Sequence, residues 1–161
     1  MDPKKEKELV SLMRNVSAIR DMLRKHGNEM MPLDALRALG EKVGHVILKE
    51  MVSKDTEGLL KELSEFFERN QLGKLEVNVF KEHKGVGEYR LVYMVQDCYD
   101  CKDSPNVGKT LCGFDEGIVK SILENKADIL SDVKETECYG TGHDHCKFEI
   151  VLKEKKMLKK W

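Results

Sequence analysis

The sequence predicts an α+β domain, in which N-terminal helices pack on a mostly antiparallel sheet with one interposed helix. Three observations predict this class. Apolar residues recur every three or four positions in the first part of the chain. The spacing changes to alternation after Gly73, and helical spacing returns once, near Phe114, before two further strands. Helices followed by strands, rather than regular alternation of the two, are typical of α+β domains.

Three helices are predicted before the first strand. The first, Lys4–Lys25, carries a narrow apolar stripe, which indicates either packing on its own domain or pairing with another subunit. Pro32 precedes the second helix, Leu33–Met51, and suits the start of a helix. The third helix, Glu57–Asn70, is followed by Gly73, a residue that often ends helices.

Two glycines, Gly40 and Gly44, stand one turn apart within the second predicted helix. A glycine inside a helix costs about 1 kcal/mol relative to alanine. Their presence therefore indicates the close approach of either another backbone or a ligand.

The strands are predicted from period-two alternation. Residues 75–79 and 89–95 form a hairpin around a turn at 82–87, and the second of these strands is central because it is apolar on both faces beyond Arg90. A helix at 114–124 follows, and then strands at about 129–138 and 146–153.

Composition limits the protein's class and location. The chain has 161 residues, with 28 Lys and Arg against 29 Asp and Glu, which argues against binding to nucleic acid. It has no apolar run of the roughly 18 residues that a membrane span requires. An odd number of cysteines without a secretory signal predicts reduced thiols and a cytoplasmic location. We divide the chain into an N-terminal helix at 1–30, a domain at 31–153 and a basic tail at 154–161.

The five cysteines all lie between Cys98 and Cys146. Cys98 and Cys101 form a CxxC pair, a spacing that suits either a metal or a redox couple. The segment after this pair contains Pro105 and Gly108 and reads as a loop. It offers no helix to stabilise a thiolate, which favours metal binding.

Cys138 and Cys146 flank a seven-residue loop between two strands, so the hairpin brings both thiols to its mouth. A tetrahedral zinc site needs two further ligands. The spacing leaves three candidate pairs open: Cys98 with Cys101, Cys112 with Glu135, or His143 with His145.

One stretch of the chain resembles the 4-vinyl-reductase family of small-molecule-binding domains. The resemblance is specific over 111–152 and weaker over 33–95, and it leaves out the first 30 residues. Members of this family include sensory domains of aromatic-responsive bacterial activators and free-standing archaeal proteins. The resemblance rests on the segments Cys112-Gly-Phe-Asp-Glu-Gly117, Glu135-Thr-Glu-Cys138 and Cys146-Lys-Phe148, together with Gly142.

The resemblance implies a zinc ion held by three cysteines and one glutamate beside a ligand pocket. This pattern falls on Cys112, Glu135, Cys138 and Cys146. Because Glu135 and Cys138 are an odd number of residues apart, the chain must leave the sheet near Thr136 for both to reach one ion. Four protein ligands make the site structural. Cys98 and Cys101, with His143 and His145, remain candidates for a second or alternative metal.

A helix-covered sheet with a closed metal site predicts a pocket between helices and sheet. We expect a floor of Tyr89, Leu91 and Tyr93 and a roof from the helix of Gly40 and Gly44. No catalytic arrangement or nicotinamide or flavin motif stands out. We therefore expect a zinc-stabilised homodimer that binds a small apolar ligand as a sensor or carrier. The family implies two alternatives: an enzyme or subunit of tetrapyrrole vinyl reduction, and a scaffold resembling vesicle-tethering relatives.

Overall fold

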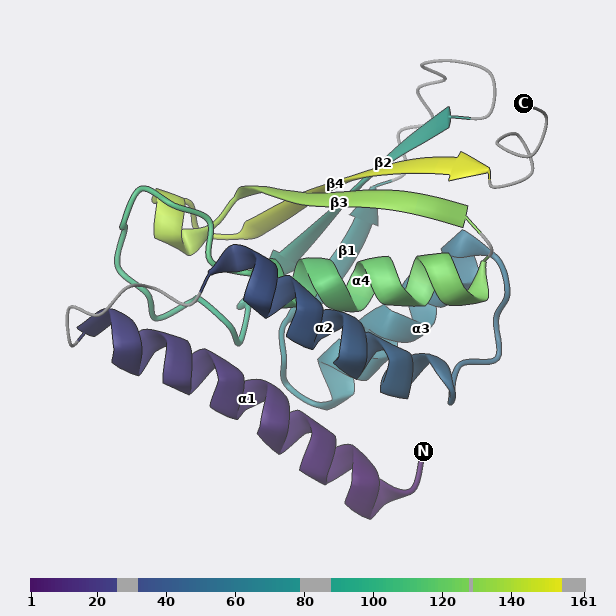
Figure 1. The fold of residues 1–161 in the computed structure, drawn as a ribbon, viewed down its shortest axis with the longest axis horizontal. Coiled ribbons are helices and arrows are strands. Elements are labelled where there is room, and N and C mark those ends of the chain that lie inside the picture. Colours follow the sequence, from purple (N-terminus) through teal and green to yellow (C-terminus); the bar gives the residue numbers. More distant parts are fainter. Residues whose placement is uncertain (26–31, 79–87, 128, 155–161) are drawn as a thin grey trace.

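The computed structural model describes residues 1–25, 32–78, 88–127 and 129–154. The predicted turn at 82–87, the end of the first segment near residue 30 and the tail after 154 lie outside these ranges. The described elements confirm the predicted α+β class (Figure 1). In chain order they are α1 (Pro3–Lys25), α2 (Leu33–Leu48), α3 (Thr56–Arg69), β1 (Lys74–Asn78), β2 (Glu88–Gln96), α4 (Gly113–Lys126), β3 (Ile129–Glu137), the short 3-10 helix η1 (Tyr139–Thr141) and β4 (Cys146–Glu154).

The four strands form one antiparallel sheet in the order β1-β2-β4-β3. β2 pairs with β1 on one side and with β4 on the other, so its prediction as a central strand is confirmed. The last two strands pair with each other as a hairpin. This topology places the start of β4 beside the end of β2, where Val95 pairs with Cys146.

The helices cover one face of the sheet (Figure 1). α4 lies against the sheet, and α2 packs on the outer side of α4. The covered face carries the buried side chains Leu91, Tyr93, Phe148 and Ile150. α3 packs beside β1, and α1 crosses outside these layers. The core therefore lies between α4 and the sheet.

The second helix ends at Leu48, three residues earlier than predicted. Met51 is nevertheless 7% exposed. The chain turns after Leu48, and the N–H of Met51 donates to the Leu48 carbonyl. The helical period continued in the sequence because Met51 still contributes to the core, not because the helix continues.

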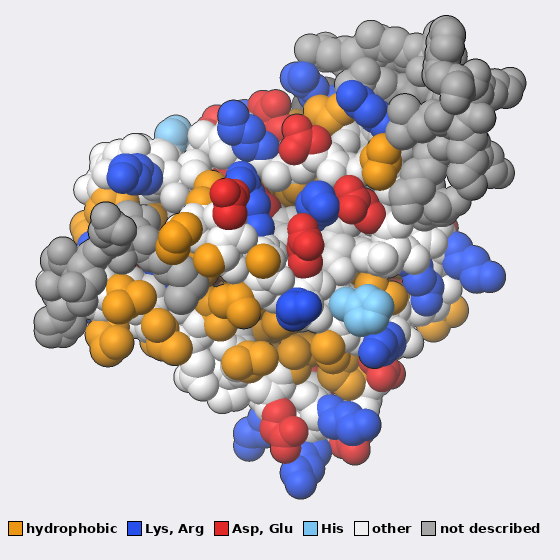
Figure 2. Space-filling view, in the orientation of Figure 1, with side chains coloured by type: hydrophobic (Ala, Val, Ile, Leu, Met, Phe, Trp, Pro, Cys, Tyr) orange, Lys and Arg blue, Asp and Glu red, His pale blue; other side chains and the backbone are white. Residues whose placement is uncertain are grey.

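α1 turns part of its surface inward and part to solvent. Leu9 and Met13 are buried, whereas Leu12, Ile19 and Met22 are between 46% and 52% exposed. Figure 2 shows apolar side chains gathered among charged ones on the face that α1 and α2 share. None of the described helices, α1 included, has the length and apolar character that a membrane span requires.

Backbone contact sets the distance between α2 and α4. A Cβ atom added at Gly40 would lie 1.9 Å from the carbonyl oxygen of Phe114, and one added at Gly44 would lie 2.6 Å from that of Ile118. From the other helix, a Cβ at Gly117 would lie 2.1 Å from the carbonyl oxygen of Arg37. The glycines thus allow the close backbone approach that was one of their two predicted roles. A ligand contact for Gly40 and Gly44 stays a prediction.

We expect Gly117→Ala to lower the free energy of unfolding by about 1–3 kcal/mol or more, because its methyl group meets backbone that cannot rotate away. Chemical denaturation measures the loss. Lys42→Ala, at an exposed position of α2, is the control and should change stability by less than about 0.5 kcal/mol. Equal stability of the Gly117→Ala variant and the unsubstituted protein would contradict the close contact.

Candidate metal centre

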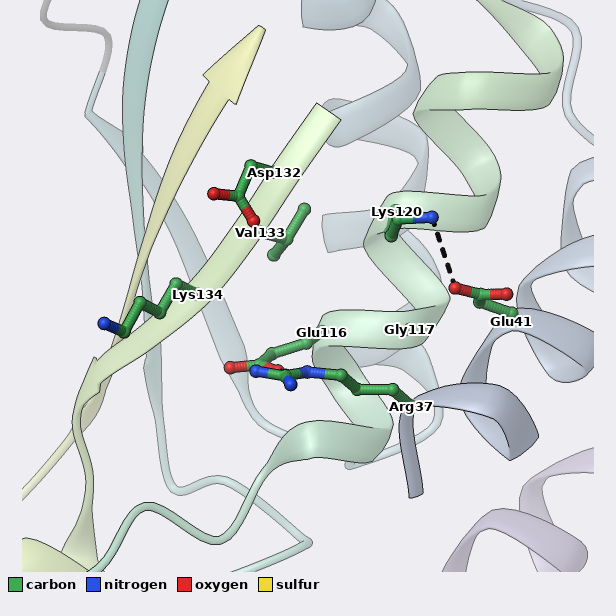
Figure 3. Close-up of a pocket in the computed structure, with 8 residues that line it drawn as sticks. All are labelled: Arg37, Glu41, Glu116, Gly117, Lys120, Asp132, Val133 and Lys134. Atoms are coloured by element: carbon green, nitrogen blue, oxygen red, sulfur yellow. Dashed lines mark hydrogen bonds and ion pairs between the residues drawn. The ribbon is translucent and has the colours of Figure 1, made fainter. Parts of the chain in front are cut away.

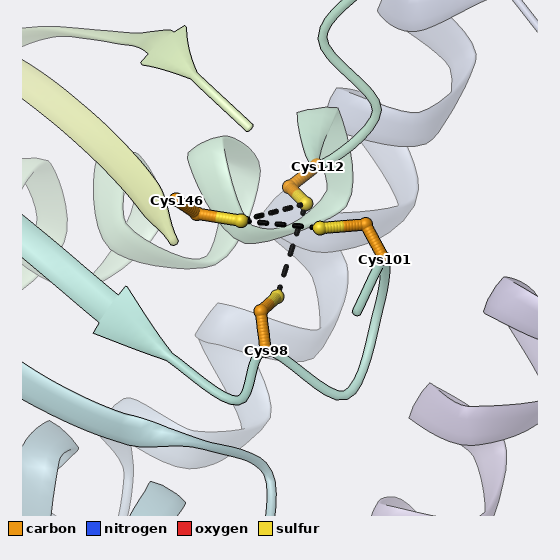
Figure 4. Close-up of side chains that lie close together, drawn as sticks. All are labelled: Cys98, Cys101, Cys112 and Cys146. Atoms are coloured by element: carbon orange, nitrogen blue, oxygen red, sulfur yellow. Dashed lines mark hydrogen bonds between the residues drawn. The ribbon is translucent and has the colours of Figure 1, made fainter. Parts of the chain in front are cut away.

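Three segments bring all five cysteines to one buried place. Cys98 and Cys101 lie in the turn after β2, where the N–H of Cys101 donates to the Cys98 carbonyl. Cys112 precedes the first turn of α4, Cys138 precedes η1, and Cys146 begins β4. All five side chains are at most 1% exposed. Figure 4 shows four of them pointing toward a common centre.

The Sγ atoms are spaced as ligands of a common metal centre would be. The Sγ–Sγ distance is 3.8 Å for Cys98 and Cys112 and 3.7 Å for Cys112 and Cys146. Cys101 lies 3.1 Å from Cys146 and 3.5 Å from Cys138. A tetrahedral site with Zn–S bonds of about 2.3 Å requires ligand atoms about 3.8 Å apart. The cluster can therefore hold a thiophilic metal ion with small adjustments.

Glu135 supplies a carboxylate to the same place. Its Oε2 accepts hydrogen bonds from the N–H groups of Leu111, at 3.0 Å, and Cys112, at 2.8 Å. Its Oε1 is buried without a hydrogen-bond partner. A β-bulge between Glu135 and Glu137 lets the chain leave the regular sheet, as the odd spacing to Cys138 predicted. An unpartnered carboxylate oxygen among thiols suits a cation ligand.

The protonation of the cluster reflects burial and mutual contact. Burial, followed by the nearby Cys138 thiolate, raises the pKa of Glu135 to about 9. Burial also raises the pKa of the Cys112 thiol, whereas hydrogen bonds from neighbouring thiols lower the pKa values of Cys98 and Cys138. The group therefore shares protons in the absence of a cation. A metal ion would displace these protons and favour the thiolates and the carboxylate.

A buried ion pair attaches α1 to the cysteine loop. Arg20 is 1% exposed, and its Nη1 donates to Asp100 Oδ1 at 2.8 Å and to the Leu111 carbonyl at 3.1 Å. Ser17 donates a further hydrogen bond to Asp100. Burial raises the pKa of Asp100 to about 6, against the opposing effect of Arg20. Asp100 lies between the two CxxC cysteines, so α1 positions them.

The predicted metal ligands are brought together in two overlapping groups. Within each group, the ligand atoms lie within 4.8 Å of one another. One group is Cys112, Glu135, Cys138 and Cys146, and the other is Cys98, Cys101, Cys112 and Cys146. The sequence treated the CxxC pair as a separate alternative, whereas the structure places it at the same centre. Which residues ligate a metal stays a prediction.

The two loop histidines lie outside both groups. The side chain of His143 is 43% exposed, and that of His145 contacts Glu137 at 2.9 Å and Asp144 at 2.7 Å. Both histidines lie in the loop between η1 and β4. Neither belongs to a close group of ligand atoms in the described part of the chain.

The predicted ligand-pocket residues lie in two different layers. Leu91 and Tyr93 are buried on the covered face of β2, and Tyr89 is half-buried there. Tyr93 stacks on Phe148 with ring centroids 4.5 Å apart, and its hydroxyl is buried without a hydrogen-bond partner. Gly40 and Gly44 contact α4, which lies between them and the sheet. Ligand contacts for these residues stay a prediction.

An open hollow of about 260 Å³ lies between α2, α4 and β3 (Figure 3). Arg37 pairs with Glu116 across it, and Lys120 lies 3.3 Å from Glu41. The other carboxylate oxygen of Glu116 accepts from the N–H of Glu135 at 2.6 Å. Sequence reasoning missed this link, although Glu116 stands in the Cys-Gly-Phe-Asp-Glu-Gly run; its partner Arg37 carries no local signal.

Comparison with known proteins places the chain among relatives of this fold. Residues 91–152 match the family model of the vinyl-4-reductase domain, which confirms the resemblance found in the sequence. The uncharacterized protein MJ0150 of Methanocaldococcus jannaschii is 32% identical over 117 residues. That match covers 73% of this chain and 63% of the relative, so the chain spans less than two thirds of it.

Two solved structures share the fold. The phenol-responsive sensory domain of the transcription activator PoxR, solved with phenol, superposes with a TM-score of 0.61 and 16% identity, covering 92% of this chain and 75% of that one. A vinyl-4-reductase family protein from Methanocaldococcus jannaschii has a TM-score of 0.50 and 21% identity, covering 93% and 81%. The likeness extends well beyond the matched domain, and it shows the fold.

Replacing Arg20 with methionine should cost about 3–5 kcal/mol of unfolding free energy, because the Asp100 carboxylate would remain buried without its cation. Adding Asp100→Asn should recover part of this loss. A double-mutant cycle followed by chemical denaturation measures the coupling. Arg14→Met is the control on the same helix, because Arg14 is exposed and bonds to backbone carbonyls. Strictly additive losses at positions 20 and 100 would contradict the ion pair.

Proposed function

The chain carries a vinyl-4-reductase domain over residues 91–152, and on this premise we propose that it binds a small apolar molecule as a sensor or carrier, with zinc holding the domain together. The observation that carries the proposal is the fold that it shares with a phenol-responsive sensory domain over 92% of the chain. We propose a cytoplasmic protein without a role for nucleic acid or membrane, in keeping with its net charge of −1.

An apolar ligand suits the chemistry of the covered sheet face. Leu91, Ile150 and the Tyr93–Phe148 stack supply aliphatic and aromatic surface. The Tyr93 hydroxyl is a buried polar group without a partner, and a ligand with one polar end could satisfy it. The proposed ligand therefore has a long apolar part and one hydrogen-bonding group. It would enter by displacing side chains between α4 and the sheet.

Zinc suits the donor set. Three thiols and a glutamate with an unpartnered oxygen provide four ligands, and these leave no open position for chemistry on the metal. The ion would connect the β3–β4 hairpin to the start of α4. We therefore assign zinc a structural role beside the ligand site and assign the protein no catalytic residue.

We further propose that the protein is a homodimer. The exposed apolar side chains of α1, Leu12, Ile19 and Met22, lie seven and three residues apart. This spacing places them on one stripe of the helix. A second copy of the chain would cover this stripe.

Palmitic acid, as a probe with a long apolar part and one polar end, should raise the melting temperature in a dose-dependent way and more than phenol at equal concentration. Binding at one hundred times the dissociation constant would add about 2.7 kcal/mol. Tyr93→Phe should keep the fold, since it removes only an unpartnered hydroxyl, and should weaken the effect of palmitic acid. Val92→Ala, on the opposite face of β2, is the matched control.

The ligand proposal fails if native mass spectrometry of protein from its own source finds no bound apolar compound and neither probe shifts the melting temperature. A larger shift with phenol than with palmitic acid would contradict the proposed ligand class while supporting the binding site.

Removal of zinc with a chelator should lower the melting temperature sharply, because binding energy at a structural zinc site is folding energy, about 10–16 kcal/mol in small zinc domains. Cys138→Ser should lose the zinc that Cys138 helps to hold, measured by elemental analysis. His143→Ala is the control, since this exposed histidine lies outside the cluster. An unchanged zinc content in Cys138→Ser would contradict the assigned ligand set.

A further inference from the structure

The cluster contains more ligands than one tetrahedral ion uses. Five thiols and the Glu135 carboxylate meet within one buried volume. A single four-coordinate ion held by Cys112, Glu135, Cys138 and Cys146 would leave the thiols of Cys98 and Cys101 beside it without a role. Both of these cysteines are as buried as the others, at 0% and 1% exposure.

The two groups of close ligand atoms share two residues, Cys112 and Cys146. Their Sγ atoms lie 3.7 Å apart. A thiolate sulfur has several lone pairs and can bind two metal ions at once. Two bridging thiolates would therefore give each of two ions a complete set of four ligands.

We propose that this cluster binds two thiophilic divalent ions, such as zinc, bridged by the thiolates of Cys112 and Cys146. Cys98 and Cys101 complete the first ion. Glu135 and Cys138 complete the second, which is the ion of the proposed function, and the inference rests on that function in this respect. The first ion is additional and gives the CxxC pair its role.

Charge compensation favours two ions over one. When all six ligands are deprotonated they carry six negative charges. One divalent ion would leave four of these uncompensated in a buried place, and two ions leave two. The buried cation beside the cluster is Arg20, and it is already paired with Asp100. A second divalent ion removes charge that the described surroundings do not neutralise.

The unshared ligands are placed to serve different ions. The CxxC turn approaches from the end of β2, while Cys138 and Glu135 come from β3 and its bulge. Cys98 lies 3.8 Å from the bridging Cys112, the spacing of neighbouring ligands on one tetrahedral ion. The Cys101–Cys146 and Cys101–Cys138 distances of 3.1 and 3.5 Å must widen when the ions bind. The position of Cys101 in a short loop turn allows this.

Elemental analysis of the full chain purified with zinc should find two ions per chain. The double variant Cys98→Ser, Cys101→Ser should retain one, and so should Cys138→Ser, because each leaves the other ion with four ligands. Cys112→Ser removes a bridge and should weaken both sites. One ion in the unsubstituted protein, unchanged in the double variant, would overturn the two-ion centre and leave the proposed function intact. No bound zinc at all would overturn both.

A second measurement needs no substitution and so leaves the fold undisturbed. Cadmium NMR of the unsubstituted, cadmium-loaded protein should give two resonances, one typical of four sulfur ligands and one of three sulfurs and an oxygen. Scalar coupling between them should report the bridging thiolates. A single resonance, two uncoupled resonances, or iron with acid-labile sulfide in protein from its own source would overturn the bridged centre.

Discussion

The fold depends on the burial of five thiols and a carboxylate at the junction of three segments. The turn after β2, the start of α4 and the mouth of the β3–β4 hairpin all meet at this cluster. Without a cation, such a group places acidic side chains next to one another out of water, and desolvation opposes their ionisation. A bound metal reverses the sign of this contribution. The same residues then hold together segments that are distant in sequence.

A second constraint acts on α4 from its outer side. Gly40, Gly44 and Gly117 let the backbones of α2 and α4 approach until no Cβ would fit between them. α4 is therefore held by the sheet and the cluster on one side and by α2 on the other. Because protein interiors are close-packed and bistable rather than continuously deformable, a change at one side of α4 is felt at the other. The Arg37–Glu116 pair lies where these two constraints meet.

Sequence periodicity was sufficient for the elements, because each helix and strand has one buried face that leaves its own spacing. It was also sufficient for the bulge near Thr136, since the alternation of a strand allows no other way to bring Glu135 and Cys138 together. It could not predict that Cys98 and Cys101 join the other thiols, because this depends on the pairing of β2 with β4, which brings Val95 opposite Cys146. Nor could it predict Arg20 as the partner of Asp100, since these residues are 80 positions apart in sequence.

The arrangement separates the role of the metal from that of the ligand site. Glu116 accepts a hydrogen bond from the N–H of Glu135, and Glu135 in turn accepts from the N–H groups at the start of α4. A displacement of α4 by a molecule that enters above the Tyr93–Phe148 stack would therefore alter the contacts of Glu135 directly. The metal cluster resists such a displacement at the N-terminal end of α4, whereas the other end is held by packing and hydrogen bonds alone. Movement of α4 about its metal-held end is thus the response to a ligand that this fold permits most easily.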